Sequence, residues 1–84
     1  MSMSKLEKLK ARLLARPAGF SYVELASLLK ALGYREDNGS GSRVAFIREG
    51  RKHIIRLHRP HPAKVLKRYQ LDQVIEELKA QEDL

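Results

Sequence analysis

The stretch RVAFIREGRKHIIRLH, residues 43–58, decides the fold because it joins two strand-forming runs by a short polar connection. RVAFIR at 43–48 and HIIRLH at 53–58 are rich in β-branched and aromatic residues, which favour strands. EGRK at 49–52 is short and contains a glycine. The sequence therefore predicts a β-hairpin.

The register of this hairpin follows from its apolar residues. A two-residue turn at 50–51 places four of them on one face, paired as Val44 with Leu57 and Phe46 with Ile55. The opposite face then pairs Arg43 with His58 and Ala45 with Arg56. A slip of one residue would bury both arginines, so the pattern favours this register. One face is predicted to be core, and the other is basic and carries a histidine.

Helices are predicted on both sides of the hairpin. The first spans 4–14, and the second begins at Ser21 and ends before Gly33, a residue typical of helix C-termini. A short strand is expected at 34–36, and a last helix at 71–78. The order α-α-β-β-β-α indicates an α+β fold with a three-stranded antiparallel sheet and the helices on one face.

Length and composition exclude several classes of protein. The 84 residues suffice for one small domain, residues 1–84, and 43% hydrophobic residues allow a modest core. Cysteine is absent, which excludes disulfide scaffolds, cysteine-ligated zinc and thiol catalysis. No apolar run approaches the length of a membrane span, and no signal peptide is visible. We expect a cytoplasmic protein that needs neither a membrane nor a small-molecule cofactor.

The net charge of +7 is concentrated in the middle of the chain. Residues 35–68 carry ten Lys or Arg and three acids, whereas residues 69–84 carry one Lys and five acids. A central basic block indicates a polyanionic partner, and composition alone does not name it.

The segment HRPHP, residues 58–62, is the most unusual in the chain. Histidine is the side chain most suited to proton transfer near neutral pH, so His58 and His61 could act as general base and general acid in metal-independent RNA cleavage. An equally good interpretation is a structural turn whose imidazoles bond to backbone. Two histidines without nearby carboxylates make a poor metal site, so no metal is expected.

Several residues are candidates for binding RNA phosphates. The Gly-rich loop 38–43 offers backbone donors, although it lacks the spacing of a Walker motif, and a flexible hairpin loop is the commoner explanation. Basic residues near the last helix could equally form a solvated face. The candidates are Ser42, Arg43, Arg56, Arg59, Lys64, Lys67 and Arg68.

Other chemistry-bearing residues have a structural interpretation. His53, beside the turn, is expected at the surface or rim. Tyr22 and Tyr69 lie beside predicted helix ends, where tyrosine more often forms the edge of a core than a platform for bases.

The chain resembles the HicA family of bacterial toxins. The resemblance rests on the order and spacing of LASLLKALG at 25–33, Gly41-Ser42, IRLH at 55–58 and the segment 66–78. It implies a fold like that of double-stranded-RNA-binding domains, metal-independent cleavage of mRNA, and a HicB-type antitoxin that covers the active face. Residues 20–84 would form the family core, and residues 1–19 an added helix and linker.

The family usually carries Gly-Ser-His with a catalytic histidine, and here Arg43 occupies the histidine position. His58 faces Arg43 in the predicted hairpin and matches a histidine that the family often has at the end of this strand. Our hypothesis is that His58, with His61, transfers the protons, while Arg43 and Arg56 hold the phosphate.

Two non-enzymatic interpretations remain. The domain could bind structured RNA without cutting it, or its basic face could recognise an acidic protein. DNA binding through a helix-turn-helix ranks lower, because the predicted sheet rather than a helix pair carries the charge.

Overall fold

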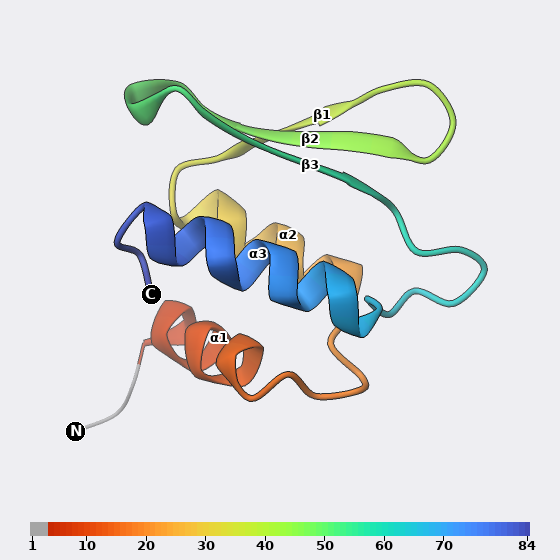
Figure 1. Cartoon of the computed structure of the whole chain (residues 1–84), viewed down its shortest axis with the longest axis horizontal. Coiled ribbons are helices and arrows are strands. Elements are labelled where there is room, and N and C mark those ends of the chain that lie inside the picture. Colours follow the sequence, from red (N-terminus) through yellow and green to blue (C-terminus); the bar gives the residue numbers. More distant parts are fainter. Residues whose placement is uncertain (1–3) are drawn as a thin grey trace.

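The computed structural model describes residues 4–84 and has the predicted order of elements (Figure 1). The N-terminal part of the expected added segment, residues 1–3, lies outside the described residues. The elements are α1 (Lys5–Leu14), α2 (Tyr22–Ala31), β1 (Arg35–Asn38), β2 (Arg43–Arg48), β3 (His53–His58) and α3 (Arg68–Ala80). The expected α+β class and three-stranded antiparallel sheet are confirmed.

The sheet has the order β1-β2-β3, and the predicted register of β2 and β3 is confirmed: Arg43 pairs with His58 and Phe46 with Ile55. The predicted two-residue turn is wrong. Residues Glu49–Arg51 form a single 3₁₀ turn, closed by Lys52 in the left-handed region with φ 52°. Both connections leave the same residues opposite each other, which is why the register survives the error.

The core lies between the inner face of the sheet and the helices. Val44, Phe46, Ile55 and Leu57 are buried, as the alternation in both strands requires. In Figure 1, α2 and α3 form a layer under the sheet, and α1 forms a third layer under them. Leu13 joins α1 to the same core and is fully buried.

Helix α2 begins and ends as predicted. Ser21 Oγ accepts a hydrogen bond from the Glu24 N–H at 3.0 Å, and the Glu24 carboxylate accepts one from the Ser21 N–H at 3.0 Å. This reciprocal capping box satisfies two N–H groups that the first turn leaves free. Gly33 follows the helix with φ 99°, a conformation that favours glycine. No helix within residues 4–84 is long and apolar enough to cross a bilayer.

Helix α3 begins three residues before the predicted start. Gln70 Oε1 accepts a hydrogen bond from the Lys67 N–H at 3.0 Å, which caps the first turn at Arg68. Upstream of this cap, Tyr22 N–H donates to the Lys64 carbonyl at 3.0 Å, so the segment between β3 and α3 is attached to the start of α2. These bonds fix the path of the chain after HRPHP.

Candidate functional site

His58 ends β3 on the exposed outer face of the sheet. Its Nδ1 shares a hydrogen bond of 3.2 Å with Ser42 Oγ, across from it at the start of β2. The Arg59 N–H donates to the Ser42 carbonyl at 2.8 Å, so backbone and side chain both tie the two strands together here. This hydrogen bond engages Nδ1, so Nε2 is the ring nitrogen that remains available for another contact.

Two hollows meet at His58. The first, of about 430 Å³, lies on the outer face of the sheet and is lined by Arg43, Arg56 and Asp37. The second, of about 270 Å³, lies between the end of β3 and the start of α3 and is lined by His61 and Lys67. His58 is a wall of both. The predicted pair of histidines therefore shares one hollow, and the predicted pair of arginines shares the other.

Gln70 holds the histidine strand to α3, and sequence reasoning missed it. Its side chain is only 3% exposed, and its Nε2 donates to the His58 carbonyl at 2.8 Å while Oε1 accepts from Lys67. Both ends of the amide are thus satisfied, which a buried amide requires. A glutamine at the start of a helix gives no signal of this role, because its partner lies twelve residues away.

Arg59 has a partly structural position. Its guanidinium lies 5.8 Å from the centroid of the Tyr22 ring, and its Nε is buried without a partner among the described residues. Burial, and then a hydrogen bond donated to Glu36, raise the pKa of Tyr22 to about 12. Tyr22 is therefore an edge of the core, as expected, and Arg59 also lines the second hollow.

The structure does not bring Lys64 and Arg68 to His58. Lys64 lines a third hollow together with His61 and Pro62. Arg68 lies beside Asp72, with 3.7 Å between Nε and Oδ1, and lines a hollow next to the linker after α1. Of the seven predicted phosphate-binding residues, only Arg68 lines no hollow with either histidine.

Tyr69 differs from its predicted role at the edge of the core. Its side chain is 63% exposed and lines the second hollow with His61. The reason is its place in the first turn of α3: Gln70 and Leu71 turn inward, so Tyr69 points outward.

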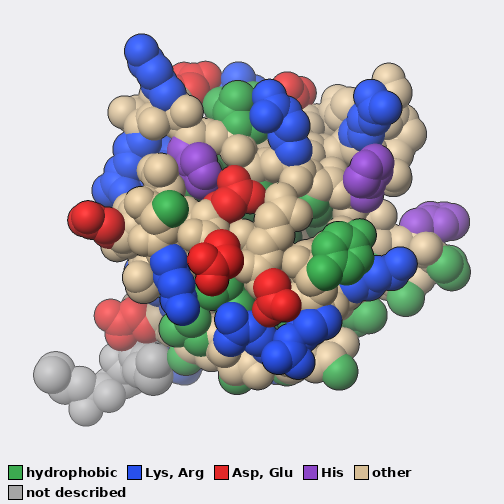
Figure 2. Space-filling view, in the orientation of Figure 1, with side chains coloured by type: hydrophobic (Ala, Val, Ile, Leu, Met, Phe, Trp, Pro, Cys, Tyr) green, Lys and Arg blue, Asp and Glu red, His purple; other side chains and the backbone are tan. Residues whose placement is uncertain are grey.

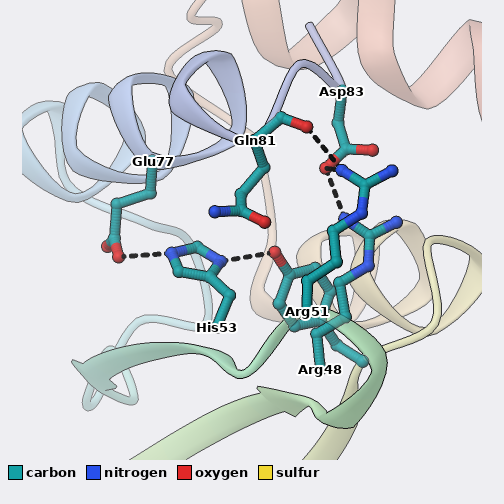
Figure 3. A network of polar contacts seen from close by, with 7 residues as sticks. Arg48, Arg51, His53, Glu77, Gln81 and Asp83 are labelled. Atoms are coloured by element: carbon teal, nitrogen blue, oxygen red, sulfur yellow. Dashed lines mark hydrogen bonds and ion pairs between the residues drawn. The ribbon is translucent and has the colours of Figure 1, made fainter.

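His53 was expected at the surface or rim, and it lies at the rim, partly buried (Figure 3). Its side chain is 17% exposed and lies between the Tyr34 hydroxyl, 2.6 Å from Nδ1, and the Glu77 carboxylate, 3.2 Å from Nε2. Beside it, Arg48 forms an ion pair of 2.6 Å with Asp83. This network joins the inner face of the hairpin to the C-terminal segment, at the other end of β3 from His58, so His53 has a structural role.

Charged side chains of both signs are spread over the surface (Figure 2). Figure 2 shows acidic side chains gathered over α3 in the middle of the visible face, and histidine and basic side chains together at its right-hand edge. The outer face of the sheet exposes Arg43, Arg56 and His58. Within residues 4–84, no group of three or more His, Cys, Asp or Glu side chains could hold a metal ion.

A family model described as "HicA toxin of bacterial toxin-antitoxin" matches residues 22–80. No curated protein and no solved structure matches the chain. The match begins at the first residue of α2 and ends at the last residue of α3, so it contains the sheet, His58 and both hollows and leaves out α1. Since it spans more than half of the chain, the protein belongs to the HicA family of toxins from bacterial toxin–antitoxin systems.

Proposed function

We propose that this protein is a metal-independent endoribonuclease that cleaves mRNA, with its site at His58. The observation that carries the proposal is the position of this imidazole: exposed, oriented by Ser42, and shared by two hollows whose walls carry cations. RNA cleavage needs a proton acceptor, a proton donor and positive charge around one phosphate. All three groups are present around His58.

The reaction is a transfer of the phosphodiester from one oxygen to another. His58 Nε2 accepts the proton of the 2′-hydroxyl, and the 2′-oxygen attacks phosphorus. The bond from phosphorus to the 5′-oxygen breaks, and His61 donates a proton to that oxygen. The products are a 2′,3′-cyclic phosphate and a 5′-hydroxyl. Arg43 and Arg56 stabilise the additional negative charge that the phosphorus oxygens carry in the transition state.

Arg43 stands where the family usually has its catalytic histidine. In this proposal His58, which pairs directly with Arg43 on the neighbouring strand, takes over the proton transfer. The arginine keeps a positive charge at all physiological pH values and therefore serves as a phosphate ligand rather than a base.

The test is cleavage of single-stranded RNA by the purified protein and by His58→Ala and His61→Ala. We expect His58→Ala to lower the rate by about 10²- to 10⁴-fold, the usual contribution of a general base, and EDTA to leave the rate of the unmodified protein unchanged. Arg35→Ala is the matched control, since Arg35 is exposed at the other end of the outer sheet face, paired with Glu49 at 3.0 Å. Full activity in both histidine variants would contradict the proposed site.

We also propose a HicB-type antitoxin as the protein partner and the cytoplasm, where mRNA is translated, as the site of action. An inhibitor of this reaction has to exclude RNA from the outer sheet face. Expression of the chain alone should arrest growth, and co-expression of its antitoxin should restore it. Growth arrest that persists in His58→Ala would separate toxicity from RNA cleavage.

A further inference from the structure

The first hollow contains one carboxylate among its cations. Asp37 lies on β1 in register with Ala45, and Ala45 is in register with Arg56, so these three side chains form one row across the outer face. Arg43 and His58 form the next row. Among residues 4–84, no Lys, Arg or His lies within ion-pair distance of Asp37.

A carboxylate is unfavourable in a site that only binds phosphate, because it repels the ligand. Asp37 is also too distant from His58 to exchange a proton with it. Asp37 and His58 are two strand spacings apart across the sheet and two residues apart along it. Their Cα atoms are therefore roughly 12 Å apart. This separation corresponds to the span of one nucleotide from its phosphate to the far edge of its base.

The walls of the hollow leave space between the carboxylate and the arginines. Ala45 contributes only a methyl group to the floor. Gly39 forms the adjoining wall, and a Cβ at this position would lie 3.3 Å from the Cβ of Arg43. The volume of about 430 Å³ falls in the range of pockets that bind small organic ligands.

We propose that the first hollow is a guanine-binding subsite, in which Asp37 accepts hydrogen bonds from the base while Arg43 and Arg56 hold the phosphate. This inference rests on the proposed ribonuclease function. Guanine presents two adjacent N–H donors, N1–H and the N2 amino group, which match the two oxygens of a carboxylate. Adenine and cytosine place a ring acceptor beside their amino group, and uracil places carbonyls on both sides of its N–H, so a carboxylate discriminates against all three.

The test compares cleavage of a pool of randomised single-stranded RNA by the unmodified protein, Asp37→Asn and Glu49→Gln. We expect the unmodified protein to prefer guanosine at one position flanking the cut by about tenfold or more. Asp37→Asn should lose this preference, because every base presents an adjacent donor and acceptor with which a carboxamide can pair. Glu49→Gln removes the same charge away from the hollow and should keep the guanosine preference. A uniform change for all sequences in Asp37→Asn would overturn the inference.

A second measurement separates this inference from the ribonuclease proposal. Hexamers of 2′-O-methyl RNA, identical except for one central guanosine or adenosine, bind without being cleaved because the nucleophile is blocked. Tighter binding of the guanosine hexamer by the unmodified protein, lost in Asp37→Asn, supports the subsite even if no RNA is cleaved. Cleavage without any base preference overturns the subsite and leaves the ribonuclease proposal intact.

Discussion

At the scale of single residues, the site depends on how His58 is oriented. An imidazole on an exposed strand end can rotate, and the hydrogen bond between Nδ1 and Ser42 Oγ fixes its direction. For Nε2 to act as the base, Nδ1 carries the proton and donates this hydrogen bond to Ser42 Oγ. The Gly-Ser pair before β2 therefore has two roles: it forms the turn, and it supplies the hydroxyl that orients the ring.

Ser42→Ala tests this orientation. We expect the turnover rate to fall by about tenfold, less than in His58→Ala, because the base remains but samples unproductive rotamers. The Michaelis constant should change little, since the arginines are untouched. Ser40→Ala in the same loop is the control, and equal activities of the two serine variants would show that the bond does not orient the ring.

Gln70 contributes to the stability of the fold through its two hydrogen bonds. Gln70→Ala leaves the His58 carbonyl and the Lys67 N–H without their partners, and we expect a loss of about 1–3 kcal/mol in the free energy of unfolding. Gln73 makes a similar bond to the Arg56 carbonyl at 2.9 Å from a more exposed position, so Gln73→Ala should cost less. Urea unfolding of both variants measures the difference, and a larger loss in Gln73→Ala would be inconsistent with this account.

At the scale of elements, the contact between α1 and the N-terminus of α2 makes the stability of the protein depend on pH. The Glu24 carboxylate accepts hydrogen bonds from Arg12 of α1 and from the Ser21 N–H. The hydrogen bond from Arg12, and then the bond to Ser21, lower the pKa of Glu24 below its usual 4.5. A lowered pKa in the folded state means that Glu24 stabilises the protein above pH 4.5 and that this stabilisation is lost as the pH falls below it.

Glu24→Gln should therefore be less stable than the unmodified protein at pH 7, and the difference should shrink between pH 5 and pH 3. Its size is modest, because Arg12 is half-exposed and water screens the pair. Glu76→Gln, which removes an exposed carboxylate from α3, is the control. Denaturant unfolding at several pH values measures the effect, and a difference that grows toward pH 3 would reverse the sign of the argument.

The helices and strands were predictable where capping residues or the alternation of apolar and polar residues mark them clearly. The alternation of Val44 and Phe46 with arginine and alanine determines the register of the hairpin, and Ser21 and Gly33 determine both ends of α2. The turn at 49–51 was not predictable, since a four-residue and a two-residue connection give the same register.

The sequence predicts which residues could form the site, but it predicts their neighbours only within the hairpin. His58 and Arg43 could be placed together because strand pairing follows from the sequence pattern. The positions of Tyr69 and Arg68 depend on how α3 packs on the sheet, and no periodicity in the chain encodes the distance between two elements. Alternation places His53 on the inner face with Ile55, but its contacts with Tyr34 and Glu77 depend in the same way on how the other elements pack on the sheet.

At the scale of the whole molecule, α1 is a third layer that lies outside the family match. Its only fully buried residue is Leu13, which packs in the core formed by the matched region. The added helix is thus part of one hydrophobic core rather than an appended arm.

Leu13→Ala and Leu14→Ala form a matched pair, since the first side chain is 0% exposed and the second is 41% exposed. We expect Leu13→Ala to lower the free energy of unfolding by about 2–5 kcal/mol, the usual loss for a buried leucine, and Leu14→Ala to lower it by well under 1 kcal/mol. Thermal unfolding of both variants tests this, and equal melting temperatures would show that α1 is peripheral to stability.

The bonds from Gln70 and Gln73 have a further consequence for self-association. Two backbone carbonyls along the free edge of β3 are already occupied by these glutamines, so that edge is a poor template for an incoming strand. The opposite edge, β1, is only four residues long and consists of Arg35, Glu36, Asp37 and Asn38, a short and charged strand that discourages pairing with another strand. A small sheet with one bare face is in this way protected from growing into fibrils at both of its edges.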